Sequence, residues 1–272
     1  MPQILSSSAW QEFRGKPKGK TLNETAIHFA IVKDAQGKRR KCAVKFVDLS
    51  ARPGLICEGL GWLLAGATDV HIPAFAAVLM VPIAKLSDCM ALPDFLHSHT
   101  EYPAWCVEIV DGSAVAQLSK WAFWLDRGKH KCLEAANTAV MASFDYWVDN
   151  QDRNYGNVIK GADGRYVAID HEALLHALLY KPSGINFELR SLLKEAEIRM
   201  KPARFLKFKC DMAAAACMHD VAITNMRVRC MSFLSAVLPG ATQSADLWKD
   251  VEIFLDERCQ KGWMSNELKV TV

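Results

Sequence analysis

Residues 150–170 read NQDRNYGNVIKGADGRYVAID, and this stretch is the most informative about the fold. An apolar run precedes it, with residues at helical spacing that predict a helix ending near Asp149: Leu133, Ala136, Val140, Phe144 and Trp147. The stretch itself begins as a polar loop, turns at the glycine-containing segment 161–164 and continues as the apolar strand 166–169. Because that strand stops at Asp170, we expect its carboxylate to lie at the rim of a rigid element.

The loop and the strand end carry side chains that phosphoryl transfer requires, namely oxygen ligands for magnesium and a carboxylate beside the attacking hydroxyl. Asn157 and Asp170 offer oxygens suited to Mg²⁺, and Asp152 could orient or deprotonate an acceptor hydroxyl. Their Asp-to-Asn spacing matches the Asp-x-x-x-x-Asn of kinase catalytic loops. Asx turns and a glycine turn would use the same residue types for backbone reasons alone. The combination with a downstream strand that ends in Asp favours the catalytic interpretation.

A cation for the nucleotide phosphates is expected from the apolar strand 41–47. Lys45 shares a face of that strand with Ala43 and Val47. An ammonium group on a mostly apolar face needs a partner, and nucleotide phosphates would provide one. Glu58, in the following helix, could pair with Lys45 and hold it, or could equally be a solvated helix residue.

The remaining patterns predict an α+β fold with two lobes. Strands at 26–32 and 41–47 form a hairpin, and a helix at 55–67 and strands at 74–83 and 104–110 follow it. After residue 112 the pattern becomes helical, apart from the loop and strand described above, and 187–260 is mostly helical. We therefore expect an N-terminal segment 1–25, mobile or part of a phosphate-binding loop, then an N-lobe at 26–112 and a helical C-lobe at 113–272. A cleft between two lobes is where a nucleotide would bind.

Composition limits the other function classes. The net charge of +3 is too small to argue for nucleic acid or a membrane surface, and we interpret the basic cluster 38–41 as a solvated hairpin tip. No apolar stretch reaches the length of about 18 residues that a membrane span needs. The nine cysteines lack metal-ligand spacing and no secretory signal precedes them, so we expect a reduced, cytoplasmic protein. Trp121 and Trp124 share a helix face, which favours packing between helices over stacking on nucleic-acid bases.

At these residues the sequence resembles the HipA-like kinase family and, more distantly, the phosphatidylinositol 3-/4-kinases. Residues 150–157 look like that family's Asn-x-Asp-Arg/His-x-x-x-Asn loop, and 169–171 like its Ile-Asp strand end. Residues 43–46 look like its ATP-binding lysine strand, Glu58 falls where it carries a Glu, and 105–109 looks like the hinge strand that lines its adenine pocket. The resemblance covers about residues 26 to 180.

The resemblance implies a two-lobed protein-kinase-like fold that uses ATP and Mg²⁺. By residue match it implies Asp152 as catalytic base, Asn157 and Asp170 as metal ligands and Lys45 on the phosphates. It also implies that the hinge strand contacts the nucleotide through Val107, Glu108 and Ile109.

Three features depart from the family pattern. No clear glycine-rich phosphate loop is present, and the candidate at 15–19 is equally plausible as a flexible tail. His171-Glu172 follows Asp170 where protein kinases have Phe-Gly. The chain is also shorter than the HipA toxins, so a toxin role and its targets do not carry over.

The first hypothesis is a cytoplasmic kinase that transfers the γ-phosphoryl group of ATP to a Ser/Thr hydroxyl of a protein, with a regulatory protein as a further partner. A small-molecule hydroxyl is the alternative acceptor. A nucleotide-binding pseudokinase or interaction module is the alternative of another class, and transfer of AMP is a third hypothesis. Nucleic acid is not expected as a partner.

Overall fold

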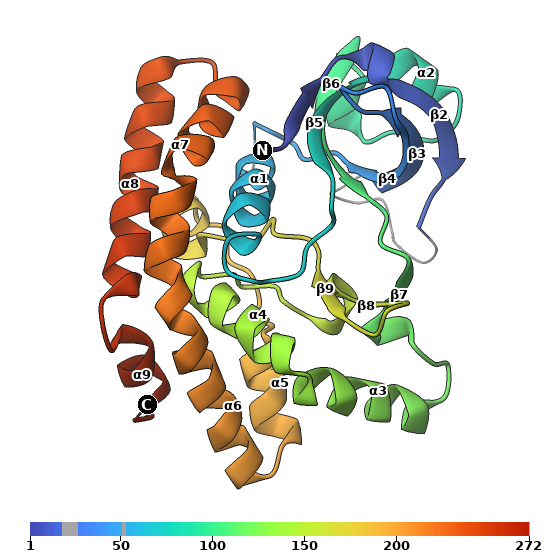
Figure 1. The fold of residues 1–272 in the computed structure, drawn as a ribbon. Helices are drawn as coiled ribbons and strands as arrows, with labels where there is room; N and C mark the ends of the chain where they lie inside the picture. Colours follow the sequence, from blue (N-terminus) through green and yellow to red (C-terminus); the bar gives the residue numbers. More distant parts are fainter. Residues whose placement is uncertain (18–26, 51–52, 272) are drawn as a thin grey trace. The chain divides into compact units, whose positions relative to one another are not determined.

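The computed structural model describes residues 1–17, 27–50 and 53–271 of the chain (Figure 1). The chain divides into two units: unit 1 comprises Met1–Leu55 and Pro73–Ile109, and unit 2 comprises Ile56–Ile72 and Val110–Val272. Unit 1 is built on a six-stranded sheet, whereas unit 2 is mostly helical and holds a three-stranded sheet. The prediction of an α+β fold is confirmed.

Unit 1 contains a mixed sheet with the strand order β1-β5-β6-β4-β3-β2, in which only the β1–β5 pair is parallel. Among the described residues, its strands and the helix that lies wholly within it are β1 (Gln3–Leu5), β2 (Trp10–Gly15), β3 (Ile27–Lys33), β4 (Arg39–Lys45), β5 (Ala76–Pro82), α2 (Ile83–Ser87) and β6 (Glu101–Glu108). The predicted hairpin corresponds to β3 and β4, which pair from Ile27 opposite Lys45 to Lys33 opposite Arg39. Gly37, at φ +84°, supplies the left-handed residue of the turn.

Side chains alternate across this sheet, so each strand has a core face and an opposite face. On the core face, Val44 and Cys106 are fully buried and belong to a hydrophobic cluster that also takes in Leu86 of α2. Lys45 lies on the opposite face, directly across from Trp105 of β6, and only 8% of it is exposed. Lys45 was expected in the middle of an apolar strand at 41–47; it does lie on a strand, but as the last residue of β4, which begins with the basic residues 39–41.

The N-terminal segment contributes to the sheet of unit 1. Residues 1–25 were expected to lie outside the lobe, but β1 pairs with β5, and β2 pairs with β3 as the edge of the sheet. Trp10 anchors β2 because its Nε1 donates to Nε2 of the buried His28, at 3.1 Å. The candidate phosphate loop at 15–19 begins at the end of β2, and its residues 18 and 19 lie outside the described residues.

Unit 2 begins with most of helix α1. Its helices and strands are α1 (Gly54–Ala65), β7 (Gly112–Ala114), α3 (Ala122–Glu134), α4 (Ala136–Trp147), β8 (Val158–Gly161), β9 (Tyr166–Ala168), α5 (Leu192–Arg199), α6 (Pro202–Ala215), α7 (His219–Val237), α8 (Ala241–Cys259) and α9 (Trp263–Leu268). The three-stranded sheet has the order β7-β8-β9. Within this unit, α7 and α8 run side by side, and α4 packs against α6 (Figure 1).

Helix α1 differs from the expectation that placed residues 55–67 in the N-lobe. A Cβ added at Gly61 would lie 2.4 Å from Cβ of His171, and one at Gly59 would lie 2.0 Å from the ring of Phe233. These two glycines let α1 approach residues of unit 2 closely. The helix is apolar nearly all round, which is typical of a buried helix and gives no sign of which unit it joins.

The helix expected through Leu133 to Trp147 is interrupted. Ala135 is extended, with ψ 135°, so α3 ends at Glu134 and α4 begins at Ala136. Thr138 holds the break because its Oγ1 donates to the carbonyl of Cys132, at 2.5 Å. The periodic spacing continues across this corner, so the corner could not be predicted from the hydrophobic pattern.

Two findings concern the chain as a whole. The nine cysteines are free thiols, and several of them are buried. Among the described residues, no helix is long and apolar enough to cross a membrane.

Candidate functional site

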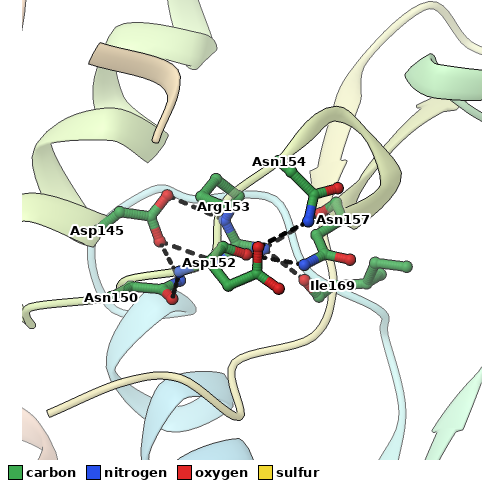
Figure 2. A network of polar contacts seen from close by, with 7 residues as sticks. All are labelled: Asp145, Asn150, Asp152, Arg153, Asn154, Asn157 and Ile169. Carbon is green, nitrogen blue, oxygen red and sulfur yellow. Dashed lines mark hydrogen bonds and ion pairs between the residues drawn. The ribbon is translucent and has the colours of Figure 1, made fainter. Parts of the chain in front are cut away.

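The candidate site in unit 2 is organised around a buried ion pair at the end of α4. Arg153 donates from Nε to Oδ2 of Asp145 at 2.9 Å and from Nη2 to Oδ1 at 3.0 Å (Figure 2). Asn150 adds a third hydrogen bond, from Nδ2 to Asp145 Oδ1, at 2.8 Å. Arginine suits this position because its planar group matches a carboxylate bidentately. The helix end is thereby joined to the loop that follows it.

Arg153 also holds the rest of the loop. Its Nη1 donates to the carbonyl of Asn157 at 3.1 Å and to the carbonyl of Ile169, immediately before Asp170 (Figure 2). The residue is fully buried, so its charge is compensated by these acceptors instead of by water. One side chain therefore connects α4, the polar loop and the end of the strand β9.

Asp152 projects from this anchored loop with one carboxylate oxygen occupied. Its Oδ1 accepts from Nδ2 of Asn154 at 2.8 Å and from Nε of Arg190 at 3.2 Å. Among the described residues, no group donates to Oδ2, and 26% of the side chain is exposed. The backbone of Arg190 is fixed as well, because its N–H donates to Gln151 and its carbonyl accepts from Arg153. Asp152 thus presents one unengaged oxygen in a fixed orientation.

Asn157 is oriented by its own amide group. Its Nδ2 donates to the main-chain carbonyl of Asp152 at 2.8 Å, across the turn that Asn154 caps through the amide of Gly156. The side chain is buried, and within the described ranges its Oδ1 accepts no hydrogen bond. An amide oxygen without a protein donor is available to a metal ion.

Asp170 has an unusual backbone conformation that its neighbours maintain. Its φ of +62° lies in the left-handed region, which Asp tolerates better than most residues. On one side, the N–H of Ile169 donates to the carbonyl of Asn157 at 3.1 Å. On the other side, the N–H of His171 donates to Oε2 of the buried Glu58 at 2.9 Å. The sequence pointed to Glu58 as a partner for Lys45, and the hydrogen bond to His171 is a contact that it did not indicate.

The segment after Asp170 is hydrogen-bonded to the start of the loop. The N–H of Gln151 donates to Ala173, that of Leu175 donates to Val148, and that of Ala177 donates to Oδ2 of Asp149. Asp149 and Leu175 both have positive φ. Each of the two hydrogen-bonded segments therefore contains one residue in the left-handed backbone conformation. Glu58, Asp152, Asn157 and Asp170 are therefore brought into one network of contacts within unit 2.

The other expected nucleotide-binding residues lie in unit 1. Val107 pairs with Ala43 and shares the sheet face of Lys45. Glu108 lies on the other face, where its Oε2 accepts from Arg40 at 3.0 Å. The N–H groups of Glu108 and Ile109 already donate to Phe75 and Lys41. Glu108 and Ile109 could therefore contact an adenine ring only through atoms other than these N–H groups.

A metal at this site would depend on few protein ligands. Among the residues that the structure describes, no group of three or more His, Cys, Asp or Glu side chains is arranged to hold a metal ion. Asn157 and Asp170 fit Mg²⁺ as hard oxygen ligands, and Mg²⁺ commonly takes its remaining ligands from water and substrate phosphates.

A cavity of about 500 Å³ opens beside the loop. Loop residues 149–151 line it on one side, and Lys194, Arg258 and Glu267 come from the surrounding helices. Arg258 donates from Nη1 to the carbonyl of Tyr146 at 3.1 Å, near the end of α4. Burial lowers the pKa of its guanidinium, an effect that the nearby carboxylate of Asp149 opposes. This volume is in the range of small-ligand sites.

Sequence reasoning assigned no role to Asp145, Arg153 or Arg190. Asp145 carried a signal, because it is an acidic residue within the apolar helical run MASFDYW. Arg153 lies within the motif 150–157, but its partners come from outside that motif. They include the carboxylate of Asp145 on the preceding helix and the carbonyl of Ile169 after β9. Arg190 lies in a polar stretch with no distinguishing pattern.

No protein-family model matches the chain, and no curated protein matches it.

Proposed function

We propose that this protein is an ATP- and Mg²⁺-dependent kinase of the HipA-like type that transfers the γ-phosphoryl group to a hydroxyl, with Ser/Thr of a protein as the acceptor. The observation that carries the proposal is the loop from Asp152 to Asn157, tied through Arg153 to the strand end at Asp170. Phosphoryl transfer depends mainly on positioning and electrostatics, and this network holds Asp152, Asn157 and the backbone on either side of Asp170 in one region of unit 2.

The proposal gives each carboxylate oxygen of Asp152 a separate role. Oδ1 is held by Asn154 and Arg190, and Oδ2 is left to accept the proton of the acceptor hydroxyl. Arg190 fixes the direction in which the carboxylate points. The same carboxylate then orients the hydroxyl oxygen towards the transferring phosphoryl group.

Asn157 and Asp170 would hold Mg²⁺, which in kinases neutralises charge on the phosphates. Asn157 contributes Oδ1 because its Nδ2 is committed to the carbonyl of Asp152. Asp170 contributes its carboxylate from a backbone clamped on both sides. The proposal assigns Lys45 of unit 1 to the nucleotide phosphates, as a buried cation on a sheet face.

The cavity beside residues 149–151 is large enough to hold an acceptor molecule or segment, and not only a water molecule. It borders the residue immediately before Asp152, and its wall includes carboxylates and cations, such as Glu197 and Lys194. Apolar side chains such as Leu192, Leu193 and Trp263 line the cavity as well, whereas Asp152, Asn157 and Asp170 do not.

A label-transfer experiment tests the proposal. The chain is incubated with Mg²⁺ and with ATP labelled at the γ or the α phosphorus, together with a cell lysate fractionated into protein and small molecules. We expect γ label in protein and none from the α position. Transfer of the α label would indicate adenylyl transfer instead, and binding of ATP without any transfer would indicate a nucleotide-binding interaction module.

Two variants connect the reaction to the site. Asp152→Asn should abolish transfer and leave ATP binding largely intact, because the side chain keeps its shape and loses its basicity. Asp163→Asn is the matched control, since Asp163 is an exposed carboxylate on the β8–β9 turn. Wild-type turnover by Asp152→Asn would contradict the proposal.

A further inference from the structure

The N-terminal end of α3 exposes three aromatic side chains. Trp121 is 76% exposed, Phe123 is 71% exposed and Trp124 is 54% exposed. The rings of Phe123 and Trp124 meet edge to face, with centroids 5.4 Å apart. The expectation that Trp121 and Trp124 pack between helices is therefore wrong. Clusters of exposed apolar residues of this kind usually mark an interaction surface.

A shallow cationic hollow lies beside these aromatic residues. It has a volume of about 380 Å³, and its polar and apolar wall includes Leu118, Ser119 and Trp124. Its charged wall consists of Arg127, Lys131 and Lys160, and no Asp or Glu lines it. The guanidinium of Arg127 lies over the ring of Trp124, 5.5 Å from its centroid. Aromatic and cationic groups thus form one continuous surface.

The acidic residues of α3 do not neutralise this surface. Asp126 pairs with Arg199, and Glu134 pairs with Arg204. In the described part of the chain, none of the three cations of the hollow takes part in an ion pair. The overall charge of +3 therefore conceals a local concentration of positive charge.

We propose that this surface, formed by Trp121, Phe123, Trp124 and the cations Arg127, Lys131 and Lys160, docks onto an anionic lipid bilayer. Trp and Phe are favoured at the boundary between headgroups and acyl chains. Basic side chains beside them are attracted to anionic headgroups, and the hollow is suited to a phosphate ester. Trp121 and Phe123 are each more than 70% exposed and do not line the hollow, which favours a deformable lipid surface over a rigid protein ridge. The proposal is independent of the proposed phosphotransferase activity.

Vesicle sedimentation of the full chain tests the proposal. The probes are vesicles of phosphatidylcholine alone and of phosphatidylcholine mixed with phosphatidylglycerol. We expect sedimentation with the mixed vesicles, a decrease as salt is raised, and at least about tenfold weaker association with phosphatidylcholine alone. Excess glycerol phosphate should compete only weakly, because it lacks the acyl region that the aromatic residues would enter.

Two triple variants separate the contributions. Trp121→Ser, Phe123→Ser and Trp124→Ser together, or Arg127→Gln, Lys131→Gln and Lys160→Gln together, should each reduce association about tenfold or more. Because these side chains are largely at the surface, circular dichroism should show that both variants remain folded.

Matched controls replace residues of the same kinds elsewhere on the surface. Ile198→Ser, Leu206→Ser and Val228→Ser remove exposed apolar side chains, and Lys181→Gln, Lys249→Gln and Lys261→Gln remove exposed cations. Both control sets should bind vesicles like the wild type. Failure of the wild type to sediment with anionic vesicles, or equal binding by all variants, would overturn the proposal. Self-association abolished by the aromatic variant, without vesicle binding, would assign the surface to a second copy of the chain and also overturn it.

Discussion

Arg153 meets Asp145 through two hydrogen bonds inside unit 2, where the arginine side chain is fully buried and the aspartate side chain is 4% exposed. The pair lies between a helix and a strand end, and neither partner touches the exposed carboxylate oxygen of Asp152. Its role is therefore to hold the loop in shape.

Arg153→Ala should lower the free energy of unfolding by about 3–5 kcal/mol, because it leaves Asp145 buried without its counter-charge. Urea denaturation followed by circular dichroism measures this change. Arg165→Ala is the control, since Arg165 pairs with Asp163 at the surface and should have little effect. The double variant Asp145→Asn, Arg153→Met should lose less stability than Arg153→Ala. Equal stability of Arg153→Ala and the wild type would rule out the anchoring role.

Asn157→Asp should disturb the loop even though it adds a carboxylate oxygen. The wild-type Nδ2 donates to the carbonyl of Asp152, and an aspartate would place two acceptors against each other there. We expect phosphoryl transfer to fall by about tenfold or more, which corresponds to about 1.4 kcal/mol, and the magnesium dependence to change. Asp163→Asn, at an exposed carboxylate on the β8–β9 turn, is the control and should leave the magnesium dependence unchanged. Unchanged magnesium dependence of Asn157→Asp would argue against Asn157 as a ligand.

Gly61→Ala should destabilise the protein by about 1–3 kcal/mol through overpacking. The new Cβ would lie 2.4 Å from Cβ of His171, an atom fixed to the backbone beside Asp170. Thermal denaturation measures the loss. Gly128→Ala is a matched helical glycine, because its nearest neighbour is the flexible end of Leu118, and it should be neutral or stabilising, as alanine favours helices. Similar melting temperatures for the two variants would contradict the close packing of α1.

Acid should destabilise the protein partly through His219. Burial lowers the pKa of His219 from 6.5 to about 3, and its ring stacks on Trp147 at 4.4 Å. Between these values the unfolded chain takes up a proton that the folded chain excludes, so stability is lost as the pH falls from about 6.5 towards 3. His219→Phe keeps a stacked ring and should reduce the slope of unfolding free energy against pH by about 1.4 kcal/mol per pH unit in this range. His130→Phe, at a half-exposed position, is the control.

Much of the secondary structure was predictable because short-range patterns determine it. The strand-like runs at 26–32 and 41–47 predicted the hairpin that β3 and β4 form, and the spacing of Asp152 and Asn157 predicted that one loop carries both. Those predictions needed only neighbours in the sequence. The break at Ala135 was not predicted, because a single residue with an extended backbone leaves the hydrophobic periodicity unchanged.

The remaining features depend on partners that are distant in the sequence. Arg153 and Arg190 gained roles only when the chain brought together the end of α4, the strand β9 and the segment before α5. The exposure of Trp124 was not predictable either, because the sequence pattern alone does not distinguish a helix face that packs from one that does not.

The glycines of α1 and the hydrogen bond from the N–H of His171 to Glu58 also bear on biosynthesis. Glu58 and His171 are separated by 113 positions, and Phe233, which packs on Gly59, lies further on. When α1 leaves the ribosome, the surfaces that it packs against in unit 2 have not yet been synthesised. The apolar surface of α1 therefore stays exposed until the rest of unit 2 has been synthesised. During this stage of translation, α1 is a natural target for chaperones.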